Sequence, residues 1–493
     1  MENGSIGTPE EPLRYCICRQ PYDAEVNGDM VCCDSGSCAI GWYHVSCLFL
    51  DVAQVRRADC FVCRFCSGSG RDVFGSAAAA RGPTGRRRGH AAAASVTDYA
   101  SLDDGDVGGA FREAVAVDAL PTAAAMAAAE ARAKATDGAA LGLAVSDTGD
   151  AWHSIPAAPS VARTAKALDM NVPAEAYDPM RVATEYGLEV LCEALDVASQ
   201  QELQPPWTLG QWMDYFRTPA ERRQRVLNLI SLEVSHTPTG RQFRAPRLIR
   251  DADWSRWCSR RRPKVGTYYL MSACGAWTSW HIDFGGSTVF YHLLRGHKVF
   301  YVAPPSTHNL HLYERWQSDP QQVVREPEFV MQLKAVARLE LLAGNTLIIP
   351  HGWLHAVFTP EDSVVIGGNI LHLRGFSMQQ RIYALERRLR VPDKYQYPLF
   401  KELSWLAARH YAARLAAARQ AGTDVKQVWD AVERRELREL ARVLRAYVQM
   451  WRKQVTLHAT ADRLRSAWTG MPPRVSTERC LQWVEALEGV PEI

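Results

Sequence analysis

Near the middle of the chain stands the run His281-Ile-Asp283-Phe-Gly-Gly-Ser-Thr-Val-Phe-Tyr291-His. It opens with a histidine and a carboxylate two positions apart, and on an extended strand that spacing places both side chains on one face. The β-branched and aromatic residues after the two glycines predict a second strand. A histidine and a carboxylate on one face of a sheet provide two ligands of a metal site, so the third ligand must come from elsewhere.

Two histidines further along the chain are candidates for the third ligand. They are His351 and His355, in the run Pro350-His-Gly-Trp-Leu-His355 about 70 residues downstream. Two imidazoles and one carboxylate on one face of Fe(II) leave open positions for 2-oxoglutarate and dioxygen. The residues themselves leave the choice between the two histidines open.

The same part of the chain has the sequence pattern of an all-β core. Five β-rich runs punctuated by Gly and Pro predict strands over 268–271, 287–294, 298–302, 346–349 and 363–371. Their spacing favours a double-sheet barrel of the jelly-roll kind, and a helical lead-in from residue 156 completes a domain over 156–390. Beyond it, 378–390, 399–420 and 424–456 have helical periodicity, with breaks at Pro392 and Pro398. We therefore expect a helical domain over 391–493.

The first part of the chain is rich in cysteine. Nine of the 13 cysteines precede residue 67, and four ligand pairs stand within residues 13–67. The pairs are Cys16 with Cys18, Cys33 with Cys38, His44 with Cys47, and Cys63 with Cys66. Such pairs suit two tetrahedral zinc ions in a domain too small to fold without metal. The other four cysteines, Cys192, Cys258, Cys274 and Cys480, are expected to be small buried hydrophobic residues.

Length and composition limit the remaining possibilities. A chain of 493 residues is too long for one compact domain, and the Ala-rich stretch over 68–155 is expected to be mostly a flexible linker with one transient helix. With 57 basic and 54 acidic residues the net charge is only +3, so we expect no bulk or sequence-specific nucleic-acid binding. No apolar run is long enough to span a membrane, and the composition predicts a soluble intracellular protein.

Four motifs together resemble the JmjC histone demethylases over about residues 185–410. They are the run from His281, Arg295-Gly-His-Lys298-Val-Phe, Ile349-Pro-x-Gly-Trp-x-His355, and Gly367-Gly-Asn369. The resemblance implies a multidomain α+β chain whose core is a cupin-like double-stranded β-helix. It also implies oxidative demethylation of a lysine by Fe(II) and 2-oxoglutarate, with release of formaldehyde.

The same resemblance assigns the ligands of both groups. His281, Asp283 and His355 would bind iron, and His351 would occupy a variable position. Lys298 would pair with the distal carboxylate of 2-oxoglutarate, and Thr278 and Tyr291 would donate hydroxyl hydrogen bonds to it. Asn228 would contact the same cosubstrate.

The Cys-rich module resembles a PHD finger through Tyr15-Cys16-x-Cys18 and Trp42-Tyr-His44. In that family the first and third pairs share one zinc, and the second and fourth pairs share the other. Cys32 is an alternative to Cys33 as a ligand. Tyr15, Tyr22, Met30 and Trp42 match positions that line a methyl-lysine cage, or else they pack the small zinc core. A cage would imply trimethylated lysine 4 of histone H3 as its ligand.

Two branches of the resembling family combine such a finger with the catalytic domain. One acts on lysine 36 of histone H3 and the other on lysines 9 and 27. The runs 303–316, 390–398 and 233–237 are more similar to the lysine-36 branch, whereas the start of the finger is similar to the other. We expect mono- or dimethylated lysine 36 as the substrate, the histone H3 tail and nucleosome as partners, and a nuclear location. A protein hydroxylase, a scaffold and a non-catalytic chromatin reader are the alternatives.

Overall fold

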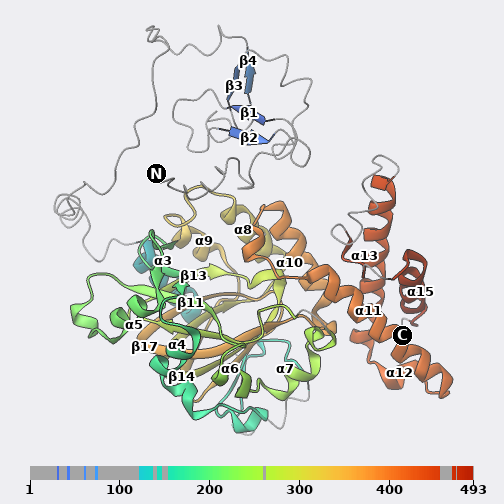
Figure 1. Ribbon diagram of the computed structural model, residues 1–493, viewed down its shortest axis with the longest axis horizontal. Coiled ribbons are helices and arrows are strands. Elements are labelled where there is room, and N and C mark those ends of the chain that lie inside the picture. Colours follow the sequence, from blue (N-terminus) through green and yellow to red (C-terminus); the bar gives the residue numbers. More distant parts are fainter. Residues whose placement is uncertain are drawn as a thin grey trace, which may run out of the picture. The chain divides into compact units, whose positions relative to one another are not determined.

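The structure is a computed structural model of the chain (Figure 1). It describes residues 30–32, 42–44, 60–62, 73–75, 121–136, 141–146, 154–258, 262–455, 469–472 and 475–491. The chain divides into two compact units, Met1–Asp103 and Asp104–Ile493, which are taken separately below.

Two short antiparallel strand pairs are described in the first unit. Strand β1 (Met30–Cys32) pairs with β2 (Trp42–His44), and β3 (Cys60–Val62) pairs with β4 (Val73–Gly75). In the β1–β2 ladder Met30 lies opposite His44 and Cys32 lies opposite Trp42. Predicted zinc ligands Cys16, Cys18, Cys33, Cys38, Cys47, Cys63 and Cys66, and cage residues Tyr15 and Tyr22, lie outside the described residues.

The second unit is built on one large sheet of eleven strands. Its order is β5-β6-β16-β14-β17-β12-β11-β8-β9, with β13 added to β17 and β15 added to β14. The strands are β5 (Ala144–Ser146), β6 (Ser160–Ala162), β8 (Ala194–Asp196), β9 (Gln201–Glu202), β11 (Leu227–Glu233), β12 (Tyr268–Ser272), β13 (Trp277–His281), β14 (Thr288–Ala303), β15 (Ala337–Leu342), β16 (Thr346–Ile349) and β17 (Leu354–Ile370).

Two long strands give the sheet its jelly-roll character. Strands β14 and β17 pair antiparallel from Thr288 opposite Ile370 to Ala303 opposite Leu354. The first half of β14 pairs with β16 and its second half with β15, while the two halves of β17 pair with β13 and β12. The two long strands β14 and β17 therefore run through both halves of the barrel and pair with different strands in each half.

The long strands bend at Gly296, where the ladder shifts register. Gly296 has φ +88°, and a Cβ added there would lie 2.3 Å from the carbonyl oxygen of Asp362 on β17. Only glycine fits such a close approach. The strands predicted over 287–294 and 298–302 are consequently one bent strand, and the strand predicted over 363–371 is the second half of β17.

Short helices surround the sheet: α4 (Pro179–Tyr186), α5 (Leu209–Arg217), α6 (Pro238–Gln242), α7 (Arg247–Ala252), α8 (Thr307–Gln317) and α9 (Glu326–Gln332). The C-terminal helices are α10 (Phe376–Arg388), α11 (Phe400–Gln420), α12 (Val425–Val428), α13 (Ala431–Val455) and α15 (Thr477–Glu488), drawn in orange to red in Figure 1. Buried Trp405, Trp429, Leu437, Leu444 and Val484 form their common core. Helices are present over the predicted segments 378–390 and 399–420, and the predicted segment 424–456 is interrupted at Trp429.

One part of the predicted linker is a packed helix. Helix α3 (Pro121–Lys134) contacts α9, and its Ala125 and Ala129 are fully buried. Its Glu130 accepts a hydrogen bond of 2.7 Å from the Tyr301 hydroxyl and lies 3.3 Å from Nε of Arg338. A transient helix was expected within this stretch, and the helix over Pro121–Lys134 is instead packed, because its small residues allow a close approach that composition alone does not reveal.

Two other expectations concern single features of the described part. No helix within it has the length and apolarity needed to cross a membrane. Of the four cysteines outside the first module, Cys192 and Cys480 are buried, as predicted, whereas Cys258 and Cys274 are only half-buried.

Candidate metal centre and cavity

Three candidate ligands come together where β13 meets β17. The two strands place His281 directly opposite His355, and Asp283 follows two residues later. One ligand atom from each of these residues lies within 4.8 Å of the other two. Strand β13 ends at His281, so Asp283 is not on the strand as its spacing predicted. It stands in extended backbone just before the turn at Gly285 and Gly286, both of which have positive φ.

Hydrogen bonds orient both imidazoles. Nδ1 of His281 lies 2.8 Å from the carbonyl oxygen of Ser279, and Nδ1 of His355 lies 3.3 Å from that of Trp353. Carbonyl partners assign the proton to Nδ1 in each ring, which leaves Nε2 with a free lone pair. His355 is 4% exposed, and burial together with His281 lowers its pKa to about 4. It is therefore held in the neutral form that a metal ligand requires.

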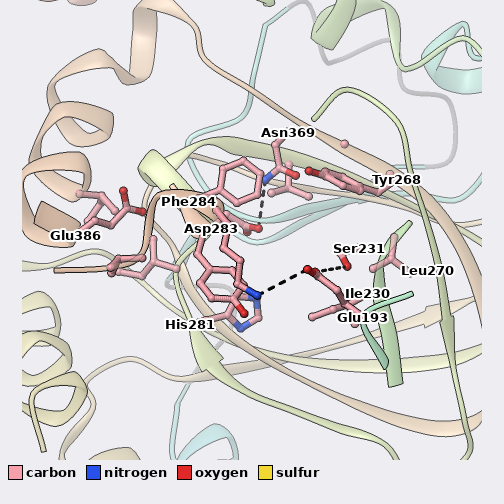
Figure 2. A pocket seen from close by; sticks show the side chains of 18 of the residues that line it. Glu193, Ile230, Ser231, Tyr268, Leu270, His281, Asp283, Phe284, Asn369 and Glu386 are labelled. Atoms are coloured by element: carbon pink, nitrogen blue, oxygen red, sulfur yellow. Dashed lines mark hydrogen bonds and ion pairs between the residues drawn. The ribbon is translucent and has the colours of Figure 1, made fainter. Parts of the chain in front are cut away.

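The carboxylate has its own supporting residue. Nδ2 of Asn369 donates to Oδ1 of Asp283 at 3.2 Å and to the Ser287 hydroxyl at 2.9 Å (Figure 2). Oδ2 of Asp283 remains 3.5 Å from Nε2 of His355. The Gly-Gly-Asn369 run contributed to the family resemblance, but the sequence did not indicate this contact of Asn369.

A buried polar network lies behind the metal centre and includes three of the predicted cosubstrate residues. Nδ2 of Asn228 donates to the Thr278 hydroxyl at 3.0 Å, and its Oδ1 accepts from Ser272 at 2.7 Å. Nζ of Lys298 donates to the hydroxyls of Ser272 and Thr359, both at 2.7 Å. We call these five residues the Lys298 network. Ser272 and Thr359 were missed from the sequence, where a single Ser or Thr in a β-rich run carries no signal.

Lys298 is the unusual member of this network. It is 2% exposed, and within the described part of the chain no carboxylate pairs with it. Burial lowers the pKa of Lys298 to about 7. A buried ammonium with only hydroxyl partners is costly, and an anionic ligand would relieve that cost.

A cavity of about 500 Å³ opens beside the metal centre. His281 and Asp283 line it, and so does Tyr291, whose ring stands edge-on to Phe300 with 5.1 Å between centroids. Burial raises the pKa of the Tyr291 hydroxyl. Lys298 is not part of the wall. Figure 2 shows Glu386 on one side of the view and Tyr268, Leu270 and Ser231 on the other, with His281, Asp283 and Phe284 between the two sides.

His351 and His355, the two candidates for the third ligand, differ in their position relative to His281. His351 lies in the turn before β17, with its ring 5.4 Å from that of His372, and it does not belong to the group of three ligands. His355 is the histidine that faces His281.

A double-sheet barrel that presents two histidines and one carboxylate to one point has the ligand set of the non-haem Fe(II) oxygenases. Comparison with known families agrees. The family described as "JmjC domain, hydroxylase" matches residues 268–370, and "Jumonji helical domain" matches residues 375–465.

Curated relatives extend this likeness over most of the chain. "JmjC domain-containing histone demethylation protein 1" of Debaryomyces hansenii is 35% identical over 390 residues, which are 75% of this chain and 73% of that protein. The protein of the same name from Mycosarcoma maydis is 39% identical over 50% of this chain and 38% of its own length. "Histone lysine demethylase PHF8" of Danio rerio is 32% identical over 80% of this chain and 36% of its own length. The chain belongs to the JmjC domain-containing histone demethylase family, although it spans well under two thirds of several of these relatives.

Proposed function

We propose that this protein is an Fe(II)- and 2-oxoglutarate-dependent histone lysine demethylase. The observation that carries the proposal is the convergence of His281, Asp283 and His355 beside the Lys298 network and an open cavity. A lysine buried with no counter-ion among the described residues lowers the stability of the fold. Binding of an anionic cosubstrate next to it would explain why the lysine lies near a metal site.

The residues present fit both groups. His281, Asp283 and His355 would hold Fe(II) through Nε2, a carboxylate oxygen and Nε2. Lys298, Thr278 and Asn228 of the network, together with Tyr291 of the cavity wall, would hold 2-oxoglutarate. When bound, iron and 2-oxoglutarate would activate dioxygen, which would oxidise an N-methyl group to a hydroxymethyl group while 2-oxoglutarate becomes succinate and carbon dioxide; the hydroxymethyl group would leave as formaldehyde.

The protein itself contributes orientation and exclusion of water. Asn369 restricts rotation of the Asp283 carboxylate, and the carbonyl oxygens of Ser279 and Trp353 keep each imidazole in one tautomer. Apolar walls such as Leu270 and Phe284 keep water from the reacting carbon.

The cavity suits a cationic side chain. Its lining includes Tyr268 and the acidic residues Glu193, Glu202, Asp283 and Glu386, against a single cation among the described lining residues, Lys394, which lies 2.8 Å from Glu202 and 3.7 Å from Glu193. Aromatic rings and carboxylates attract an alkylated ammonium, which loses little hydration on entry. This charge pattern favours methyl-lysine over an anionic or neutral substrate.

For the substrate we propose mono- or dimethylated lysine 36 of histone H3, on the similarity of runs 303–316, 390–398 and 233–237 to that branch. Lysines 9 and 27 are the alternative, on the similarity of the finger. We further propose a nuclear protein that acts on nucleosomes. Its finger, over 13–67, would hold two Zn(II) ions and read the H3 tail through Tyr15, Tyr22, Met30 and Trp42.

Mass spectrometry of H3 peptides tests the reaction. Peptides dimethylated at lysine 36, 9 or 27 are incubated with protein, Fe(II), 2-oxoglutarate and ascorbate, with His281→Ala as the control. Loss of methylene mass from the lysine-36 peptide alone supports the proposal, and loss from another peptide changes the branch. Gain of one oxygen indicates a hydroxylase, and no change together with retained peptide binding indicates a reader.

The finger needs a separate test. Trp42→Ala is expected to abolish binding of an H3 peptide trimethylated at lysine 4 while two zinc ions stay bound. Unchanged peptide binding by that variant rules out the cage.

A further inference from the structure

The segment that carries His281 and Asp283 is irregular at both ends. Before it, the β13–β17 ladder changes register between Thr278 and His281. Three residue steps on β13 there oppose two on β17, from Val357 to His355, which is the pattern of a β-bulge. After it, the chain turns sharply at Gly285, with φ +60°. Irregular backbone of this kind leaves amide groups that the sheet does not satisfy.

A buried carboxylate satisfies the bulge. Glu326, the first residue of α9, is 1% exposed. Its Oε1 accepts from the backbone amide of Trp280 at 3.0 Å and from the Ser279 hydroxyl at 2.6 Å, and its Oε2 accepts from Nε1 of Trp277 at 3.4 Å. Trp280 immediately precedes His281, and the Ser279 carbonyl is the partner of the His281 ring.

A second buried carboxylate satisfies the turn. Glu386 of α10, labelled in Figure 2, is 6% exposed. Its Oε1 accepts from the backbone amide of Gly285 at 2.6 Å. Its other oxygen is buried with no hydrogen-bond partner among the described residues. Burying a carboxylate for one hydrogen bond costs stability, so a leucine there would favour folding more. The burial of Glu386 has a physical reason if the backbone at Gly285 must be held in a fixed position.

We propose that Glu326 and Glu386 are positioning residues for the metal site. Together they form a carboxylate clamp that holds the backbone on both sides of the His281–Asp283 pair and so sets the separation of these two ligands. The clamp rests on the proposed function, because it acts through residues assigned there as metal ligands. Neither glutamate belongs to the group of three ligands.

A purely structural role would give a different pattern, and the chain contains a matched control. Glu436 of α13 is 2% exposed and accepts from the backbone amide of Ser377 at 2.7 Å and from its hydroxyl at 2.5 Å. Its bonds are of the same kind as those of Glu326, but they hold Ser377 at the start of α10, nine residues before Glu386 on the same helix, and they do not reach the ligand segment. Glu436→Ala therefore reports the loss of a buried carboxylate with both clamp carboxylates still present.

The test measures Mn²⁺ binding to the full chain by the electron paramagnetic resonance signal of free Mn²⁺, without cosubstrate or turnover. Glu326→Ala and Glu386→Ala are each expected to weaken Mn²⁺ binding by about 10- to 100-fold, as loss of a ligand's supporting partner does. Glu326→Gln and Glu386→Gln keep an acceptor oxygen and should bind within a few-fold of wild type. Glu436→Ala should lower the melting temperature but leave the affinity unchanged. The absorption spectrum of bound Co²⁺ should change in the two alanine clamp variants only.

The outcomes separate the clamp from the proposed function. If wild type binds Mn²⁺ and both alanine clamp variants bind it equally well, the clamp is wrong and the proposed function stands. If Glu436→Ala loses affinity to the same extent, the effect is one of general stability and the clamp is also wrong. If wild type itself binds no Mn²⁺, both fail. Should Glu326→Ala not fold, Glu386→Ala decides, because it removes a single hydrogen bond at the other end of the segment.

Discussion

Replacement of Lys298 by methionine should stabilise the protein that has no cosubstrate bound. Methionine has nearly the length of lysine and no charge to desolvate. The side chain lies among the network residues, 2% exposed, where burial lowers the pKa of Lys298 from 10.5 to about 7. At a pH below the folded-state pKa, Lys298 is protonated in both the folded and the unfolded chain. The folded state then bears the full free-energy cost of the buried charge.

The magnitude follows from the two pKa values. The difference, 10.5 − 7 = 3.5, corresponds to roughly 5 kcal/mol of destabilisation at low pH and about 4 kcal/mol at pH 7. The variant leaves the hydroxyls of Ser272 and Thr359 without their donor, at about 1 kcal/mol each. We expect Lys298→Met to be more stable than wild type by about 2 kcal/mol at pH 7.

The pH dependence has a definite sign. Between the folded and unfolded pKa values the unfolded chain holds one proton more than the folded chain, so wild-type stability rises with pH. The stability advantage of Lys298→Met over wild type should therefore shrink as the pH rises from about 7, the folded-state pKa of Lys298, to about 10. With 2-oxoglutarate at 100 times its dissociation constant, wild type should gain about 2.7 kcal/mol and the variant nothing.

Urea denaturation of both proteins at pH 7 and pH 9, with and without 2-oxoglutarate, measures these differences. The reasoning is refuted if Lys298→Met is less stable than wild type at pH 7 without cosubstrate. It is also refuted if the difference between the two proteins does not change with pH, or if 2-oxoglutarate stabilises both equally.

Three further perturbations have expected outcomes. Asn369→Ala removes the donor to Asp283 and should weaken Mn²⁺ binding about 10-fold in a titration, with little change in melting temperature; full retention of affinity would contradict the orienting role. Arg223→Met breaks the paired 2.6 Å hydrogen bonds to Asp362 at the bend of β17 and should cost about 2–3 kcal/mol in urea denaturation. Ala129→Asp places a charge on the buried face of α3 and should lower the melting temperature by several degrees, whereas Ala127→Asp, on the exposed face, should not; equal effects would mean that α3 is not docked.

Several elements could be predicted because their signal is local. The strand over 346–349 and the helices near 378–390 and 399–420 agree with the structure within a few residues. Runs of β-branched residues and helical periodicity with proline breaks carry the information for such elements. Strands β11, β13 and β15 were missed; β15 alternates buried and exposed residues over six positions, so its signal was present in the sequence, whereas β11 and β13 have no such alternation.

The packing of α3 could not be predicted from composition. Alanine repeats are typical of both linkers and close helix contacts, and only the partner surface distinguishes them. Here that surface is α9 together with the polar pair of Tyr301 and Arg338, which stand on strands far along the chain.

By itself the sequence determined which residue types can form the site. The His-x-Asp spacing, the two candidate histidines His351 and His355, and a lysine in a β-rich run limit the chemistry, because side-chain type decides which atoms can bind metal or anion. Only the tertiary structure decided which of these candidate residues lie next to one another. The register of β13 against β17 brings His281 to His355 and leaves His351 outside. Burial on β14 makes Lys298 a cation with no counter-ion among the described residues, and α9 and α10 bring Glu326 and Glu386 to the ligand segment. These are contacts between residues tens of positions apart, and no local pattern encodes them.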